Sequence, residues 1–192
     1  LVIENIRTGK KTIVPRATRA KLSEDGSKVV AVIKPLFEQT RQAKIKKAKK
    51  EDMPKDTLAL IDVKSGKVEK YANYKSHATA DKWSNYLAFE LTPAKEKADK
   101  KAPKAEGKDD KKKPAPKKEV NKLLVMNVLT NKVDTLKNVT SYKFNEDGSW
   151  LAYVVEPEKK DSLGKAGLFL YNPANGESKA VLEGAKGSMF KT

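Results

Sequence analysis

Short apolar runs alternate with polar turns along most of this 192-residue chain. Four segments repeat one pattern: a Leu opens an apolar run, Asn or Asp stands four residues later, and Gly or Asn stands eight residues later. An Asx side chain accepts hydrogen bonds from backbone N–H groups ahead of it, and Gly or Asn tolerates left-handed backbone. Each copy therefore predicts a β-hairpin. The openings are Leu1, Leu58, Leu123 and Leu168, the Asx residues are Asn5, Asp62, Asn127 and Asn172, and the turn residues are Gly9, Gly66, Asn131 and Gly176.

A second pattern falls between these hairpins and predicts a turn followed by a buried strand. Residues 25–27 and 147–149 both have the sequence Asp-Gly-Ser, and each is followed by a run of apolar residues. The middle copy departs from this pattern, because residues 83–85 are Trp-Ser-Asn. The three apolar runs end close to Pro35, Pro93 and Pro157.

The spacing of the two patterns indicates a true period. From each of the first three hairpin turn residues to the Pro that follows, the distance is 26 or 27 residues. Only the length of the link from that Pro to the next hairpin varies. When the residues by which the longer links exceed the shortest one are left out, a period holds about 45 residues. This is the size of a four-stranded β-propeller blade. We therefore predict an all-β fold of antiparallel four-stranded blades, about three and a half of them, forming part of a β-propeller.

Two insertions interrupt this period between the second and third strands of successive blades. Residues 36–52 contain helix formers without Pro or Gly and predict a short solvated helix, with a basic amphipathic membrane or calmodulin-type helix as the alternative. Residues 95–121 consist almost entirely of Lys, Ala, Pro, Glu and Asp and predict a disordered segment. The predicted boundaries are 1–14 for a half blade, 18–71 for a blade with the helical insertion 36–52, 75–137 for a blade with the disordered insertion 95–121, 140–182 for a blade, and 188–192 for the start of the next.

Composition and charge first suggest a nucleic-acid partner, but the distribution of charge argues against one. The chain has a net charge of +16, one His and no Cys. Residues 34–56 and 95–122 carry +4 and +6 of that charge, so the basicity is local to the two insertions. The second insertion has no Arg and no aromatic residue to stack on bases, so we expect no nucleic-acid partner, although binding of phosphates through it stays open as a hypothesis.

The absence of Cys excludes disulfides and thiolate metal sites, and the chain has no apolar run long enough for a membrane span.

The two repeated patterns also resemble those of a known protein family. Residues 147–153, Asp-Gly-Ser-x-Leu-Ala-Tyr, followed by residues 168–176, Leu-x-Leu-x-Asn-x-x-x-Gly, are similar to the propeller repeats of the prolyl oligopeptidase family of serine peptidases, in particular the secreted Bacteroides-like bacterial members. The resemblance covers nearly the whole chain but only the N-terminal propeller of that family. It implies a periplasmic or secreted protein whose peptidase activity belongs to a C-terminal α/β-hydrolase domain.

The chain itself offers no candidate catalytic, cofactor-binding or metal-binding residue. The nucleophile elbow Gly-x-Ser-x-Gly is absent, since Gly187-Ser188 lacks the second Gly. A Ser-His-Asp triad would have to use His77, which we expect to be an ordinary turn or surface histidine. We assign the aromatic residues that lie within the second pattern to the blade core and to packing between blades. They are Trp83, Trp150, Tyr86 and Tyr153.

These observations lead to one expected function and one alternative. The resemblance implies a non-catalytic propeller fragment that limits access of peptides to the hydrolase domain, so the expected partners are that domain and peptide substrates, with no cofactor. We expect the chain to be a fragment of a longer precursor, because it has no initiator Met and no leader. The alternative is a non-enzymatic binding or scaffolding propeller of TolB-like or WD40-like type.

Overall fold

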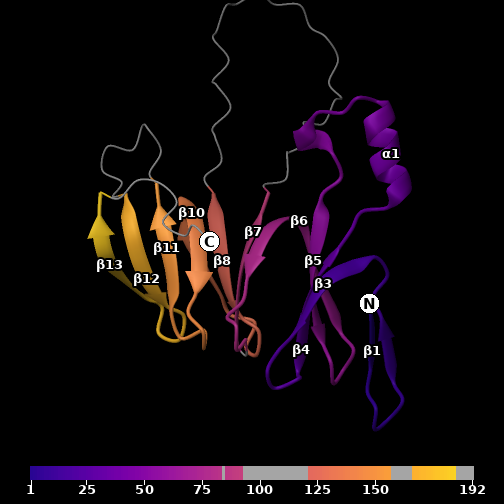
Figure 1. The fold of residues 1–192 in the computed structure, drawn as a ribbon, viewed down its shortest axis with the longest axis horizontal. Helices are drawn as coiled ribbons and strands as arrows, with labels where there is room; N and C mark the ends of the chain where they lie inside the picture. The colour runs from indigo at the N-terminus through magenta and orange to yellow at the C-terminus, as the bar shows by residue number, and fades with distance from the viewer. Residues whose placement is uncertain (84, 93–120, 157–165, 185–192) are drawn as a thin grey trace, which may run out of the picture.

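The computed structural model describes residues 1–83, 85–92, 121–156 and 166–184, and these residues form antiparallel β-structure with one short α-helix (Figure 1). The predicted insertion 95–121, apart from its last residue, lies outside the described residues, as do the predicted start of a blade at 188–192 and Gly187-Ser188. The strands are β1 (Val2–Glu4), β2 (Lys11–Ile13), β3 (Ala17–Leu22), β4 (Lys28–Ile33), β5 (Asp56–Asp62), β6 (Val68–Ala78), β7 (Tyr86–Leu91), β8 (Lys122–Asn127), β9 (Val133–Lys137), β10 (Val139–Phe144), β11 (Leu151–Val155), β12 (Gly167–Asn172) and β13 (Glu177–Glu183).

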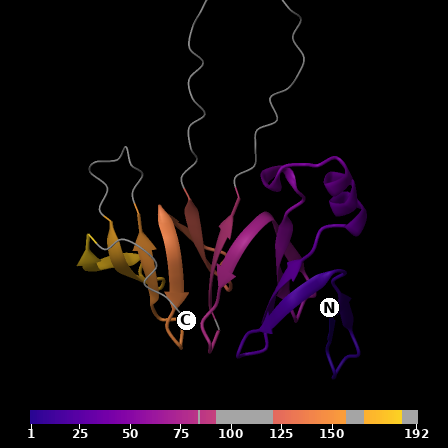
Figure 2. The same ribbon diagram turned by 45° about the horizontal axis from the view of Figure 1, so that its top comes forward.

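The strands pair strictly in chain order. β1 and β2 form a separate hairpin, β3 to β9 form one seven-stranded sheet, and β10 to β13 form a four-stranded sheet. The seven-stranded sheet comprises two four-stranded units that share β6, because its first residues pair with β5 and its last residues pair with β7. We call these units 1 and 2, and β10 to β13 unit 3. The all-β antiparallel fold is confirmed, and its four-stranded units follow one another along an arc as propeller blades do (Figure 2).

The boundary between units 1 and 2 differs from the expected interruption between residues 71 and 75. β6 is continuous from Val68 to Ala78, and Tyr74 pairs on both sides, with Asp56 of β5 and with Leu91 of β7. Irregularities in the register lie on either side of Tyr74. The strand therefore turns from one unit into the next without leaving the sheet.

All four predicted hairpin turns are present and use the predicted chemistry. The N–H of each turn residue donates to the carbonyl of the Asx residue four positions earlier, over 2.8–2.9 Å. The Asx side chain also accepts backbone N–H bonds, for example from Arg7 and Thr8 to Asn5 Oδ1. The turn residues all have left-handed backbone, including the non-glycine Asn131 at φ 60°. The Leu-to-Gly repeat of the sequence is thus a structural repeat.

The hydrophobic core lies between consecutive units and not within any one of them. One cluster joins the first hairpin to unit 1 and includes Val14 and Ile61. A second cluster joins units 1 and 2 around Leu58 and Trp83, and a third joins units 2 and 3 around Leu123 and Leu151. Unit 1 packs between the first hairpin and unit 2, and unit 2 packs between units 1 and 3, so apolar burial stabilises each of these three seams.

The aromatic assignments are confirmed for some residues and wrong for one. Trp83 is 1% exposed and Tyr153 is 6% exposed, and both belong to the core clusters. Tyr86 packs against the third cluster from a partly buried position. Trp150, however, is 38% exposed. It stands directly after the Asp-Gly-Ser turn, before the first residue of β11, where the chain has not yet entered the interface between units.

The helical insertion is shorter than expected and stands apart from the core. An α-helix, α1 (Phe37–Ile45), and a 3₁₀ turn, η1 (Lys50–Asp52), replace the single helix predicted for residues 36–52, and neither contains a buried residue. α1 lies between β4 and β5, at the edge of the arc opposite the hairpin turns (Figure 1). None of the described helices is long and apolar enough to cross a membrane.

Candidate functional site: the inner-strand face

The first strands of the three units lie next to one another. These strands are β3, the C-terminal half of β6, and β10, and we call their shared surface the inner-strand face. Lys21 Nζ on β3 donates to the carbonyl of Ala80, just after β6, over 2.6 Å. The Ser76 hydroxyl on β6 and the Tyr142 hydroxyl on β10 are 2.7 Å apart. The inner strands therefore contact one another directly from unit to unit, and they lie on the near side of the arc in Figure 2.

Every inner strand begins with the same backbone feature, which the sequence repeats did not predict. Arg16, Asn73 and Asn138 all have left-handed backbone, with φ of 57–60°. Each of these three carbonyls accepts a hydrogen bond from a backbone N–H over 2.7–3.1 Å. The donor is in each case the residue immediately before one of the three Pro residues of the second pattern. Asn at two of the three positions was a readable signal, because Asn adopts left-handed backbone more readily than most residues do.

Each inner strand also contains a bulge where it pairs with the second strand of its unit. The register shifts lie between Thr18 and Lys21, between Tyr74 and Ser76, and between Val139 and Ser141. In the first of these bulges Arg19 has a φ of 51°, left-handed for a residue with a Cβ. Bulges bend a strand and redirect its side chains, and they are common beside functional sites. The inner-strand face thus departs from regular β geometry in all three units.

A pair of aromatic and imidazole side chains lies at the centre of this face. The Tyr74 hydroxyl and His77 Nδ1 form a hydrogen bond of 2.8 Å, and the two rings are 5.6 Å apart. Burial lowers the pKa of His77 below its ordinary value, and the nearby charges of Arg19 and Lys21 lower it further. The imidazole is therefore neutral at pH 7. Its partner is a phenol, whereas the histidine of a catalytic triad is oriented by a carboxylate.

The remaining polar groups of the face are tied to unit 2. Lys75 Nζ forms an ion pair of 2.6 Å with Glu90 Oε2, and the Glu90 side chain is only 6% exposed. The Tyr142 phenol is protonated at neutral pH, and burial raises its pKa further above the ordinary value of 10. Such groups can donate hydrogen bonds to a ligand, but none is arranged as a nucleophile with its base. In the described part of the chain, no group of three or more His, Asp or Glu side chains could hold a metal ion.

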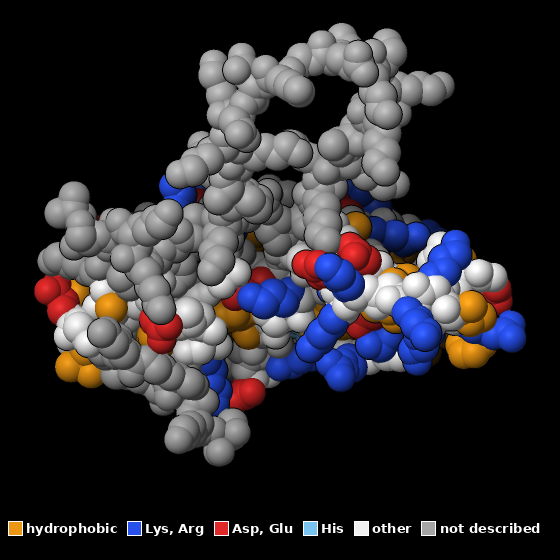
Figure 3. Space-filling view, turned by 90° about the horizontal axis from the view of Figure 1, so that it is seen from above, with side chains coloured by type: hydrophobic (Ala, Val, Ile, Leu, Met, Phe, Trp, Pro, Cys, Tyr) orange, Lys and Arg blue, Asp and Glu red, His pale blue; other side chains and the backbone are white. Residues whose placement is uncertain are grey.

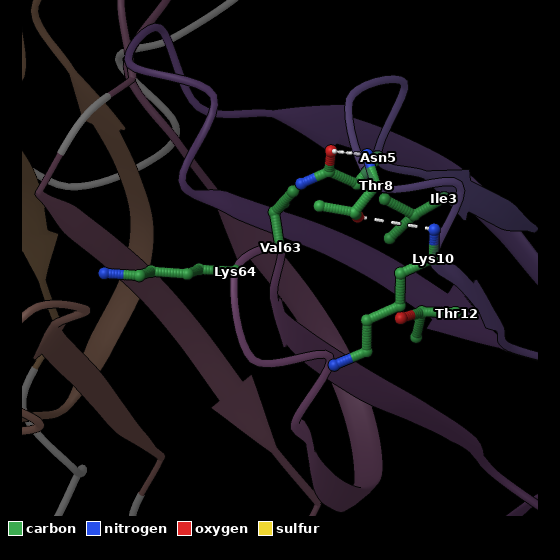
Figure 4. A pocket seen from close by; sticks show the side chains of 7 residues that line it. All are labelled: Ile3, Asn5, Thr8, Lys10, Thr12, Val63 and Lys64. Carbon is green, nitrogen blue, oxygen red and sulfur yellow. Dashed lines mark hydrogen bonds between the residues drawn. The ribbon is translucent and has the colours of Figure 1, made fainter.

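In the described part of the chain, three small clefts recur at equivalent places along the edge of the arc that carries the hairpin turns. Each lies between the outer hairpin of one unit and the adjacent hairpin of the next. The largest, about 300 Å³, separates the first hairpin from unit 1 (Figure 4). The other two measure about 210 Å³ and 50 Å³. The lining of the largest cleft is Ile3, Asn5, Thr8, Lys10, Thr12, Val63 and Lys64.

The recurrence of these clefts explains their origin. Lys10 Nζ reaches across the largest one to the carbonyl of Ser65 over 2.9 Å, and Gly66 packs so closely that a Cβ there would lie 2.8 Å from Thr12 Oγ1. Each cleft is the wedge left where two hairpin turns diverge from a shared core. We therefore assign the clefts to the packing of successive units, and the inner-strand face remains the candidate site.

Comparison with known proteins finds likeness among solved structures only. No family model and no curated protein matches the chain. The β-propeller domain of the Trilobed protease from Pyrococcus furiosus has 14% identity and a TM-score of 0.49, with 88% of this chain and 43% of that chain covered. The acylaminoacyl peptidase of Pyrococcus horikoshii has 16% identity and a TM-score of 0.47 (95% and 27% covered), and the tricorn protease has 13% and 0.45 (90% and 14% covered). The chain thus spans less than half the length of each.

Proposed function

We propose that this chain is the propeller portion of a serine peptidase of the prolyl oligopeptidase family and that it limits the access of peptides to a C-terminal α/β-hydrolase domain. The observation that carries the proposal is the repeat itself. Four hairpins with the same Asx and turn residues organise consecutive units around adjacent inner strands. The sequence of those repeats resembles the propeller of that family.

The arrangement of the inner strands is suited to a filtering role. A surface made of first strands from several units faces the axis around which propeller blades are arranged. Its exposed side chains, such as Arg19 and Ala20 on β3, would set the width and polarity of any passage along that axis. We propose that the protein is periplasmic or secreted and that its partners are its own hydrolase domain and peptide substrates.

The first experiment asks whether the parent protein is a serine peptidase. The natural protein is treated with a fluorophosphonate probe that labels activated serines, and the labelled peptide is sequenced. We expect labelling at the Ser of a Gly-x-Ser-x-Gly motif outside this chain. A natural protein without a labelled serine and without peptidase activity would instead be a binding or scaffolding propeller.

The second experiment asks whether the inner strands filter substrates. Ala20→Trp places a large side chain on the exposed surface of β3, and Ala174→Trp is the matched control on the exposed turn between β12 and β13. In the natural protein we expect Ala20→Trp to lower kcat/KM for a long peptide more than for a short chromogenic peptide. The control should lower neither. Equal behaviour of the two variants would refute the filtering role.

A further inference from the structure

The strands of the inner-strand face contribute cations but no carboxylate, and the carboxylates beside the face, Glu90 and Asp56, are paired with Lys75 and Lys34. The residues that form its strands and their left-handed starts, 16–22, 73–78 and 138–144, contain no Asp or Glu. The outer strands of the three units are the first part of β6, β9 and β13, and all contain acidic residues, so this bias belongs to the inner strands and not to the chain as a whole. The cations of the three segments are Arg16, Arg19, Lys21, Lys75 and Lys143.

These cations differ in how far they are committed to internal partners. Lys75 is paired with the buried Glu90, and its charge is therefore compensated. Lys21 donates one hydrogen bond to the carbonyl of Ala80, a neutral acceptor, so its charge is not neutralised by that contact. Arg19 is exposed, stands in a bulge, and has a left-handed backbone that disfavours any residue with a Cβ. A guanidinium held there at a conformational cost is the strongest candidate for contact with a ligand.

Arg19, Lys21 and the Tyr74–His77 pair lie close together. Lys21 bridges β3 to the end of β6, on which Tyr74 and His77 form their 2.8 Å hydrogen bond. The charges of Arg19 and Lys21 also lower the pKa of His77, which places both cations within electrostatic reach of the ring. Beside them, the hydroxyls of Ser76 and Tyr142 form the contact with unit 3. Lys and Arg side chains also gather over the half of the molecule that carries unit 1 and α1 in Figure 3.

We propose that the inner-strand face around Arg19, Lys21 and His77 binds a peptide carboxylate. A guanidinium offers two parallel N–H donors that match the two oxygens of a carboxylate, and a second cation beside it strengthens the attraction. The choice of a peptide as the bearer of that carboxylate rests on the proposed function, whereas the anion site rests on the exposed Arg19 in its bulge and on the contact of Lys21 with Ala80. The carboxylate comes either from the C-terminus of the peptide or from an Asp or Glu side chain.

The test measures peptide binding to the purified natural protein by calorimetry. The probes are a neutral peptide with a free C-terminus, the same peptide amidated, and an amidated peptide with one internal Glu. We expect the first or the third to bind more tightly than the amidated neutral peptide. Which of them does so identifies the source of the carboxylate. Equal affinity for all three, or no binding of any, would overturn the proposal.

Variants then locate the site. Arg19→Gln should weaken binding of the preferred peptide about tenfold or more, as expected for loss of a charged hydrogen bond, and Lys21→Gln should weaken it less. Arg7→Gln, at an exposed arginine on the turn of the first hairpin, is the charge-matched control and should leave binding unchanged. Arg19→Gly removes the guanidinium while favouring the left-handed backbone, so it separates loss of the site from loss of folding. If Arg19→Gln and Arg7→Gln bind alike, the site is not at Arg19.

The outcomes also separate this proposal from the proposed function. A natural protein that lacks peptidase activity but shows carboxylate-dependent binding sensitive to Arg19 would refute only the peptidase role. A peptidase whose activity and binding ignore both the peptide carboxylate and Arg19 would refute only the carboxylate site.

Discussion

The ion pair at Asp62 gives the sharpest test of the hairpin repeat. Asp62 occupies the position that Asn fills in the other three copies, and its Oδ1 accepts the Ser65 N–H over 2.7 Å in the same way. Asp62 differs in that its Oδ2 also accepts a hydrogen bond of 2.8 Å from Lys28 Nζ, in a pair whose side chains are 16% and 30% exposed. Asp62→Asn therefore keeps the acceptor of the turn and removes only the charge, whereas Asp62→Ala removes both.

The structure sets the expected magnitudes. A partly buried ion pair lies between an exposed pair and a charged hydrogen bond, so Asp62→Asn should lower the free energy of unfolding by about 1 kcal/mol. Asp62→Ala also leaves the Ser65 N–H without its acceptor and should cost about 2–3 kcal/mol. Asn127→Asp is the control, because Asn127 lies opposite Tyr86 in the register, where Asp62 has Lys28 opposite it.

The dependence on pH tests the physical cause. The hydrogen bond from Lys28, with those from Ser65, holds the pKa of Asp62 well below its ordinary value of 3.8. Because the folded pKa is depressed, the contribution of the carboxylate is complete above the unfolded pKa and is lost as the pH falls below it. Urea unfolding followed by circular dichroism should thus show a deficit for Asp62→Asn at pH 7 that shrinks near pH 3. The reasoning would be refuted if Asp62→Asn were as stable as the unsubstituted protein at pH 7. It would also be refuted if the difference in free energy of unfolding did not change with pH.

Three further changes test the core, the turns and the buried phenols. Leu58→Ala opens a cavity in the fully buried cluster between units 1 and 2 and should lower the free energy of unfolding by about 2–5 kcal/mol in urea titrations. Gly66→Ala should cost more than Gly9→Ala, since both have left-handed backbone but only at residue 66 would the new Cβ lie 2.8 Å from Thr12 Oγ1; equal melting temperatures for these two would contradict the close contact. Burial raises the pKa of Tyr71 to about 12, so an ultraviolet titration of the parent should contain a late phenol that is missing in Tyr71→Phe. Because that phenol ionises first in the unfolded chain, its contribution to stability should decline as the pH rises above about 10.

The hairpins could be predicted because their determinants are local. An Asx side chain, a left-handed residue and two apolar runs lie within about a dozen residues, and no distant contact is needed to choose the turn. The same holds for the Asp-Gly-Ser turns, in which Asp25 and Asp147 accept the N–H of the Ser two residues ahead. The period of about 45 residues then followed from counting.

Features that depend on neighbouring units could not be predicted. Residues 71–75 contain no Pro or Gly and no hairpin signal, so nothing in the sequence indicates whether the chain breaks there or continues as β6. The exposure of Trp150 depends on where the strand after the Asp-Gly-Ser turn enters the interface between units, which the apolar run itself does not indicate. The neighbours of His77 are likewise set by packing, since Arg19 and Lys21 come from a different unit. The candidate site is therefore a product of assembly between repeats.

The continuity of β6 has a mechanical consequence. The strand is hydrogen-bonded to β5 through its first residues and to β7 through its last residues. It cannot detach from one partner without straining its pairing with the other, so units 1 and 2 should open as one cooperative block. Between units 2 and 3 the chain passes from β9 to β10 through Asn138, whose N–H donates to the Asn121 carbonyl and whose carbonyl accepts the Glu156 N–H. The second seam is held by these two backbone hydrogen bonds and by the Ser76–Tyr142 contact but is not one continuous strand, so we expect the arc to widen there before it widens at β6.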